Sequence, residues 1–186
     1  MEAIGLVGGL ASGKDSFGKF IVENKGGFLI SSSSVARDYI LNNSLGEPTR
    51  DMTRLIAAHL RNKFGKDYLI KKCVESMPRE ELLVVSGLYV IEEVIALRSL
   101  FKSVIVHVET PDELRMHRAV KRSRSTDESD FKNFYRLDNE DMSASITDQC
   151  LGDVIKLSDI NIDGSIPISN KEYWNLQMEN VFKYDH

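Results

Sequence analysis

The segment Gly8-Gly9-Leu10-Ala11-Ser12-Gly13-Lys14 constrains this chain more than any other feature. It fits the pattern G-x-x-x-x-G-K and follows an apolar run at residues 3–7 that predicts a buried strand. After it, apolar residues repeat at helical spacing over residues 14–24. Glycines let backbone amides curl around a phosphate, a helix start adds partial positive charge, and a lysine neutralises the outer phosphates. The segment therefore predicts a strand, a phosphate-binding loop and a helix, with ATP contacts from Gly8, Gly9, Leu10, Ala11, Ser12, Gly13, Lys14, Asp15 and Ser16.

The residue after Lys14 departs from the usual pattern. It is Asp15, where a serine or threonine hydroxyl normally binds Mg²⁺, and Ser16 stands one place later. The apolar run that predicts the central strand ends at Ser86, with no aspartate at the position that normally holds the metal. We hypothesise that Asp15 supplies the missing carboxylate and binds Mg²⁺ with Ser16, since Mg²⁺ prefers oxygen ligands. The alternative is that both changes weaken the metal site.

Short apolar runs alternate with helical patterns along the rest of the chain. Strands are predicted at residues 3–7, 28–30, 82–85, 104–108 and 160–164. Met52, Leu55, Ile56 and Leu60 predict one helix face, and Trp174, Met178, Val181 and Phe182 predict a closing helix. Thr110 and Pro111 are expected to start another helix as its N-cap and first residue. This alternation predicts an α/β fold with a parallel sheet covered on both faces.

Length and composition narrow the class of protein. A chain of 186 residues fits one domain, and its net charge of −4 argues against a surface that binds a nucleic-acid backbone. The two cysteines match no metal-ligand spacing, and no apolar stretch approaches the ~18 residues of a membrane span. We expect a cytoplasmic single-domain protein, monomeric or homodimeric, with small-molecule partners and neither nucleic acid nor membrane.

Residues 121–142 differ in composition from the rest of the chain, because charged side chains predominate there. We expect this stretch to project from the core as a mobile flap. Its acidic residues are expected to face solvent; they are Asp127, Asp130, Asp138, Glu140 and Asp141.

Four segments together resemble P-loop kinases of the nucleoside monophosphate kinase and dephospho-CoA kinase group. They are residues 4–16, 30–37, 46–50 and 115–124. The resemblance implies a three-layer α/β/α fold with a five-stranded parallel sheet. It also implies a helical acceptor-binding insert at about 31–77 and an arginine-bearing lid at about 121–142.

The resemblance also indicates which residues meet the acceptor. Arg37 matches the arginine that grips the acceptor phosphate in nucleoside monophosphate kinases, and Ser34 replaces the aspartate of that pattern. Arg50 is expected to make a second acceptor contact, and Tyr89, in a position where many relatives have arginine, to stack on a base. Dephospho-CoA kinases carry a catalytic aspartate near the position of Ser33. A phosphate acceptor needs no such base, so the missing carboxylate favours a nucleoside or deoxynucleoside monophosphate, with dephospho-CoA as the alternative acceptor.

A basic run follows the fourth predicted strand. Arg115, Arg118 and Arg122 have the spacing of one helix face. We expect Arg118 near the adenine or the phosphates, and Arg122 and Arg124 at the charge that develops on the transferred phosphoryl group. The predicted catalytic residues are therefore Lys14, Arg118 and Arg122.

The leading hypothesis is an enzyme that moves the γ-phosphate of ATP to a small nucleotide acceptor, with Mg²⁺ as cofactor. The rival hypothesis from another class is a non-catalytic or weakly hydrolytic nucleotide-binding regulatory protein. Asp15 and Ser86 motivate that rival, because they stand where the usual metal-binding residues are replaced.

Overall fold

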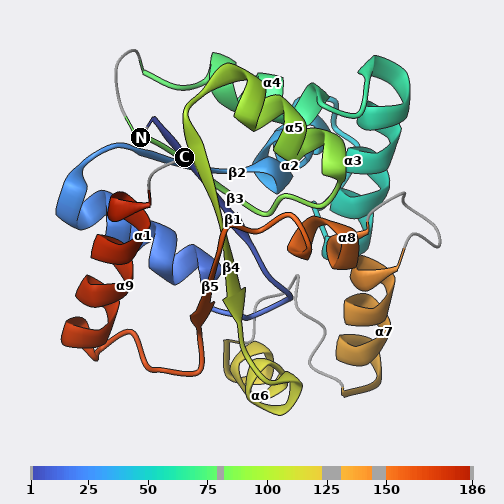
Figure 1. Ribbon diagram of the computed structural model, residues 1–186. Coiled ribbons are helices and arrows are strands. Elements are labelled where there is room, and N and C mark those ends of the chain that lie inside the picture. The colour runs from blue at the N-terminus through green and yellow to red at the C-terminus, as the bar shows by residue number, and fades with distance from the viewer. Residues whose placement is uncertain (1, 79–81, 123–130, 144–149, 185–186) are drawn as a thin grey trace.

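The computed structural model describes residues 2–78, 82–122, 131–143 and 150–184. Its centre is a parallel five-stranded sheet of order β2-β3-β1-β4-β5 (Figure 1). The strands are β1 (Ala3–Val7), β2 (Phe28–Ser31), β3 (Leu83–Ser86), β4 (Ser103–Glu109) and β5 (Ile160–Asp163). All five predicted strands are confirmed within two residues. The three central strands are largely buried between two helical layers, and the edge strands β2 and β5 are only partly buried.

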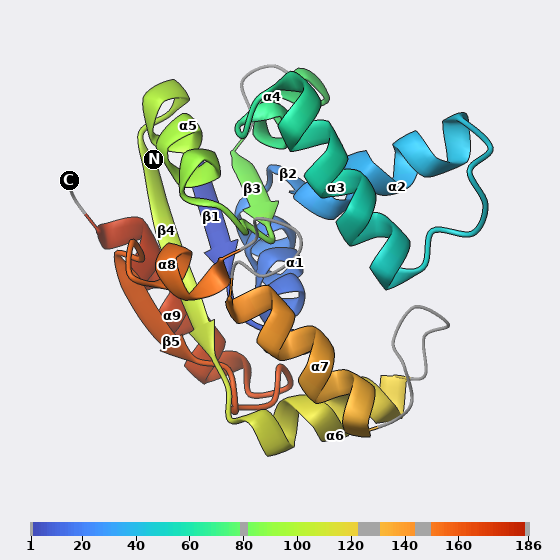
Figure 2. The same ribbon diagram turned by 90° about the vertical axis from the view of Figure 1, so that its right-hand side faces the viewer.

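The helices form the two outer layers and a bundle beside the sheet (Figures 1 and 2). They are α1 (Lys14–Lys25), α2 (Ser32–Asn42), α3 (Arg50–Phe64), α4 (Tyr68–Glu75), α5 (Ile91–Leu100), α6 (Asp112–Arg122), α7 (Phe131–Met142), α8 (Leu151–Ile155) and α9 (Lys171–Lys183). Helices α1 and α9 pack on one sheet face, and α4, α5 and α8 pack on the other. The predicted three-layer α/β/α fold is confirmed.

The strand order places a crevice beside the first strand. The chain passes from β1 outward to β2, returns to β3, and then crosses β1 to reach β4. Ligands of open parallel sheets bind at such a switch point, outside the carboxyl ends of the strands. The residues that follow β1 and β3 therefore meet at one edge of the sheet.

The predicted apolar face of α3 is confirmed at Ile56 and Leu60 and wrong at Leu55. Leu55 is 52% exposed, whereas Leu60 is buried. The other buried residues of the helix are Thr53, Arg54, Ala57, Ala58 and Arg61. An apolar pattern could not find the whole of this face, because its inward side carries two arginines whose charges are paired after folding.

The prediction of a projecting, solvent-facing flap is also wrong for the described part of that segment. Phe134 of α7 is buried with Leu10 of the phosphate loop and Met116 of α6. Asp138 and Asp141 are buried, and both pair with arginines. Charge alone did not predict exposure, because oppositely charged partners lie far away in the sequence; Asp127 and Asp130 lie outside the described residues.

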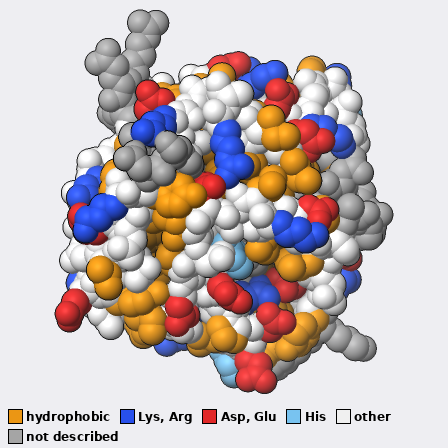
Figure 3. Space-filling model, in the orientation of Figure 1, with side chains coloured by type: hydrophobic (Ala, Val, Ile, Leu, Met, Phe, Trp, Pro, Cys, Tyr) orange, Lys and Arg blue, Asp and Glu red, His pale blue; other side chains and the backbone are white. Residues whose placement is uncertain are grey.

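Acidic and basic side chains are interspersed on the face of the molecule seen in Figure 3, with apolar side chains between them. Within the part of the chain that the structure describes, no helix is long and apolar enough to cross a membrane.

A buried ion pair joins the helical bundle to the segment after β3. Arg61 of α3 donates to Glu93 Oε1 through Nε at 3.0 Å and Nη2 at 2.6 Å, and the two side chains are at most 1% exposed. Glu93 Oε2 also accepts the backbone N–H of Tyr89 at 2.8 Å. The pair therefore fixes the start of α5 and the backbone of Tyr89 against α3.

Replacing Arg61 by Met is expected to destabilise the protein by about 3–5 kcal/mol, because it leaves the Glu93 carboxylate buried without its partner. Lys71→Met is the matched control, since it breaks an exposed pair with Asp67 and is expected to cost less than about 1 kcal/mol. Urea unfolding followed by circular dichroism measures both. Equal losses in the two variants would contradict the role given to Arg61.

Candidate functional site

The phosphate loop joins β1 to α1 at the crevice. Gly13 has φ +99° and lies at the N-cap of α1, and Ala11 also has a left-handed backbone, with φ +59°. The N–H groups of the first helical turn, which begins at Lys14, have no acceptor within the helix. Lys14 is 8% exposed, and its Nζ lies 3.5 Å from the Gly9 carbonyl oxygen. The lysine is thus folded back over the loop, beside the start of a helix, an arrangement suited to a phosphate.

Two residues that follow β4 support the loop from behind. The Thr110 hydroxyl donates to the Ser12 carbonyl at 2.8 Å. Arg115 Nη1 donates to the Leu10 carbonyl at 3.2 Å. Its guanidinium also holds both oxygens of Asp138 at 2.5 and 2.7 Å. Burial would lower the pKa of Arg115, but the hydrogen bonds of Asp138 and Asp112 outweigh it, and the net shift is upward.

These contacts correct two expectations. Helix α6 begins at Asp112, and Thr110 binds the phosphate loop instead of capping the helix. Arg115 is buried and does not share an exposed basic face with Arg118. Thr110 and Arg115 both donate hydrogen bonds to carbonyl groups of a loop about 100 residues earlier. Rules for helix starts consider only neighbouring residues and could not predict these contacts.

Arg118 lies beside the loop in a cavity of about 450 Å³. Its Nη1 donates to the Gly164 carbonyl at 2.7 Å and its Nη2 to the Ser165 carbonyl at 3.0 Å. The cavity is lined by residues 11–16 of the loop and helix start and by residues 164–168 after β5. Arg118 is therefore held next to the loop by backbone oxygens, and burial lowers its pKa. The side chain of Arg122 and the whole of Arg124 lie outside the described part of the chain, so their roles stay predictions.

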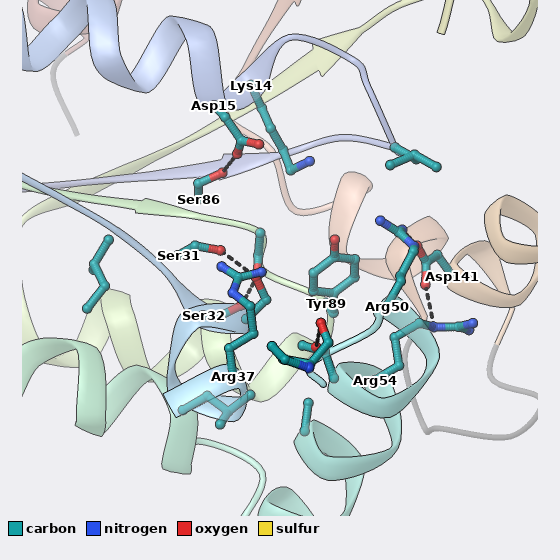
Figure 4. Close-up of a pocket in the computed structure, with 18 of the residues that line it drawn as sticks. Lys14, Asp15, Ser31, Ser32, Arg37, Arg50, Arg54, Ser86, Tyr89 and Asp141 are labelled. Atoms are coloured by element: carbon teal, nitrogen blue, oxygen red, sulfur yellow. Dashed lines mark hydrogen bonds and ion pairs between the residues drawn. The ribbon is translucent and has the colours of Figure 1, made fainter. Parts of the chain in front are cut away.

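Asp15 and Ser86 face each other across the crevice (Figure 4). The Ser86 hydroxyl, at the end of β3, donates a hydrogen bond to the Asp15 carboxylate. In the usual arrangement the hydroxyl follows the lysine and the carboxylate lies near the central strand. Here the two residue types are exchanged, yet a carboxylate and a hydroxyl still meet next to Lys14. Their oxygens suit Mg²⁺. Ser16 is exposed and lines only the cavity of Arg118.

A second cavity, of about 370 Å³, opens on the other side of Lys14 and Asp15. We call it the acceptor-side cavity. Cationic side chains from three helices line it; they are Lys14, Lys19, Arg37, Arg50, Arg54 and Arg61. Arg37 makes no hydrogen bond or ion pair with any residue that the structure describes, and it points into the space beside Tyr89 (Figure 4). The cavity is therefore suited to a small anion.

Serine hydroxyls form the floor near Arg37. The Ser32 hydroxyl donates to the Gly87 carbonyl, and the hydroxyls of Ser31 and Ser33 are hydrogen bonded to each other at 2.8 Å. Ser34 was expected to meet the acceptor, but its hydroxyl donates to the Ser31 carbonyl at 2.6 Å and the residue does not line the cavity. Helix α2 begins at Ser32, so Ser34 lies in its first turn, where its hydroxyl is already bound to the backbone.

The structure thus brings Arg37, Arg50 and Tyr89 together in one cavity and adds residues that the sequence analysis missed. Arg54 and Asp141 are the main ones. The position of Arg54, four residues after Arg50 on the same helix, was a signal for a shared face. No sequence signal connected Asp141 with either arginine.

The chain is similar in sequence to archaeal proteins described as UPF0200 proteins. One from Sulfurisphaera tokodaii is 29% identical over 160 residues, which cover 86% of this chain and 85% of the relative. One from Methanosarcina acetivorans is 29% identical over 172 residues, covering 90% and 88%. No family model matches the chain.

Solved structures of small-molecule kinases share the architecture. Shikimate kinase from Aquifex aeolicus superposes with a TM-score of 0.56 at 16% identity, over 98% of this chain and 99% of that one. A gluconokinase from Sinorhizobium meliloti superposes with a TM-score of 0.56 at 18% identity, over 99% and 97%. The chain has a P-loop kinase-like fold. At these identities the likeness concerns the fold alone.

We predict that the stability of the protein depends on glycine at position 9, because a side chain there would collide with Arg115. A Cβ atom at residue 9 would lie 2.4 Å from Arg115 Nη1. Gly9→Ala is therefore expected to lower the free energy of unfolding by about 1–3 kcal/mol through overpacking. In an Arg115→Met background the same substitution is expected to cost less by about 1 kcal/mol or more, since the clashing group is gone. Calorimetric unfolding of the four proteins measures the coupling, and additive effects would contradict this account.

Proposed function

We propose that this protein is an ATP-dependent phosphotransferase that moves the γ-phosphate of ATP to a small anionic acceptor, a nucleoside or deoxynucleoside monophosphate. The observation that carries the proposal is the position of Lys14 between two cavities. One of them is bounded by the phosphate loop and Arg118, and the other is lined by arginines of α2 and α3. A donor and an acceptor would therefore meet at Lys14.

The chemistry of the acceptor-side cavity favours a phosphorylated acceptor. Its carboxylates among the described residues are Asp15 and Asp141, and both are bound by neighbouring side chains. A hydroxyl acceptor benefits from a free carboxylate base, whereas a phosphate acceptor needs charge neutralisation and alignment. Two structural neighbours are kinases named for shikimate and gluconate, which fits an anionic acceptor as a class.

In the proposed reaction Lys14 neutralises the outer phosphates of ATP, while Arg37 and Arg50 hold the acceptor phosphate. Arg118 lines the nucleotide side, and Arg122 and Arg124 of the lid would meet the transferred phosphoryl group. Mg²⁺, held by oxygens of Asp15 with Ser16 or Ser86, would neutralise charge on the β- and γ-phosphates. Helices α6 and α7, which pack against Leu10 of the loop, would help to exclude water, which otherwise competes as acceptor.

A second candidate is a nucleotide-binding regulatory protein with little turnover. The hydrogen bond between Ser86 and Asp15 favours it, because each residue already satisfies the other. The two candidates differ in one property: a kinase consumes ATP only when an acceptor is present.

The deciding experiment measures ADP formation from Mg-ATP with CMP, dCMP, UMP, AMP, dTMP, dephospho-CoA, shikimate or gluconate. Acceptor-dependent turnover with a monophosphate is expected, and Lys14→Met is expected to reduce it by at least about 10²-fold because a preorganised cation is lost. Acceptor-independent hydrolysis, or none, would refute the kinase proposal. Turnover with dephospho-CoA alone would identify that alternative acceptor.

The contact between Asp15 and Ser86 gives a separate prediction about metal binding. Asp15→Ser and Ser86→Asp are each expected to weaken Mn²⁺ binding to the ADP complex by about tenfold, through loss of a ligand or repulsion between carboxylates. The double variant Asp15→Ser/Ser86→Asp is expected to recover most of the affinity, because it contains one carboxylate and one hydroxyl again. Electron paramagnetic resonance of Mn²⁺ measures binding without turnover. Unchanged affinity in Asp15→Ser would show that Asp15 is not a ligand.

A further inference from the structure

Asp141 of α7 lies in the wall of the acceptor-side cavity, between Arg50 and Arg54 of α3 (Figure 4). Its Oδ2 is 2.5 Å from Arg50 Nη2, and its Oδ1 is 3.0 Å from Arg54 Nε. The Asp141 side chain is only 2% exposed. One buried carboxylate therefore bridges two arginines, with one oxygen for each.

This geometry is the one in which a pair of arginines holds a phosphate or a carboxylate. Arg54 has two unused donors: its Nε, which meets Asp141 only as an ion pair, and its Nη2 are buried and have no hydrogen-bond partner among the described residues. Arg54 itself is 7% exposed and lines the cavity. A buried arginine with an unused donor beside a cavity indicates a built anion site.

The local charge balance decides how a second anion could enter. The cluster contains three arginines and three carboxylates, with ion-pair distances between 2.5 and 3.7 Å; its members are Arg50, Arg54, Arg136, Asp51, Glu140 and Asp141. A phosphomonoester carries about −1.5 to −2 charges at pH 7. The side chains of Arg136 and Asp51 are exposed, but Asp141 is 2% exposed and shares both cavity arginines. A phosphate that binds the same two arginines would repel this buried carboxylate, so binding requires that the carboxylate leave. Asp141 is the carboxylate that contacts both cavity arginines.

We propose that Arg54 completes the subsite in which Arg37 and Arg50 hold the acceptor's phosphate, and that Asp141 occupies the part between Arg50 and Arg54 when no acceptor is bound. The acceptor then binds by exchange: its phosphate oxygens replace Asp141 Oδ1 and Oδ2. The pairs Arg54–Glu140 and Arg136–Asp51 still join α3 and α7. This inference rests on the proposed function, since it assigns the acceptor's anion within the same cavity.

The exchange lowers the apparent affinity for the acceptor by the fraction of protein in which Asp141 is displaced. It also links acceptor binding to the donor loop. Asp138, three residues earlier on α7, holds Arg115, which contacts the Leu10 carbonyl. A phosphate that takes the place of Asp141 therefore removes a buried ionic contact of the helix that also holds Arg115 behind the donor loop.

The experiment titrates CMP, cytidine and inorganic phosphate into the full chain by calorimetry, with the phosphate loop saturated by Mg-ADP. Asp141→Asn is expected to tighten binding of CMP and phosphate by about tenfold, corresponding to 1.4 kcal/mol, because the resident anion is gone. Cytidine, which lacks the phosphate, is expected to show no change. Arg54→Gln is expected to weaken CMP and phosphate binding in the wild-type background.

Two further variants separate the proposal from general electrostatics. Asp38→Asn removes an exposed negative charge on α2 next to Arg37, outside the cavity lining, and is expected to leave phosphate affinity unchanged. Asp141→Glu keeps the competing charge and is expected to bind phosphate with affinity near that of wild type. If Asp141→Asn is poorly stable, its unfolding midpoint gives the same information: phosphate is expected to raise it more than that of wild type.

Unchanged or weaker phosphate binding by Asp141→Asn would overturn the proposal, since Asp141 would then position the arginines or leave binding to Arg37. This failure is distinct from failure of the proposed function. Absence of Mg-ADP binding would refute the kinase assignment, whereas Mg-ADP binding with no effect of Asp141→Asn would refute only the exchange.

Discussion

The parallel pairing of β1 with both β3 and β4 is the constraint on which the rest of this structure depends. Because the strands run in one direction, the loop after β1, Ser86 after β3 and Thr110 after β4 emerge at the same edge of the sheet. The phosphate loop thus gains its contacts to Thr110 and Arg115 from the neighbouring connection. Every functional group discussed above lies at this edge or on the helices that cover it.

Helix α7 links the two sides of the site. Asp138 pairs with Arg115 behind the donor loop, and Asp141 pairs with Arg50 and Arg54 in the acceptor-side cavity. A spacing of three residues places both carboxylates on one side of the helix. Both are buried, so each pairing is strong only as long as its partner stays in place. An anion that competes for the arginines would therefore change how α7 packs.

Asp15 and Ser86 illustrate how two residue types can exchange positions and still meet in the fold. A carboxylate and a hydroxyl meet beside Lys14, although each stands at the position where the other is usual. From the sequence alone we hypothesised that Asp15 supplies the carboxylate that is missing at Ser86, with a weakened metal site as the alternative. Their side chains come into contact because β3 and the start of α1 lie next to each other.

Local sequence determined the sheet and the phosphate loop. The apolar runs were enough to predict the strands, because such runs are stable when they are buried. The glycines and Lys14 were enough to predict the phosphate loop, because they follow a strand and precede a helix. Arg37 and Arg50, which the family resemblance singled out, line the same cavity, and their roles stay predictions. Only the tertiary structure decided which charged residues are buried and which partners they bind. The buried face of α3, the recruitment of Arg115 and Thr110 by the loop, and the burial of Asp138 and Asp141 all depend on partners far away in the sequence. Hydrophobic periodicity shows which positions along a chain are apolar. A charged side chain is buried only when an oppositely charged or hydrogen-bonding partner lies next to it, and the tertiary fold decides which partners are neighbours.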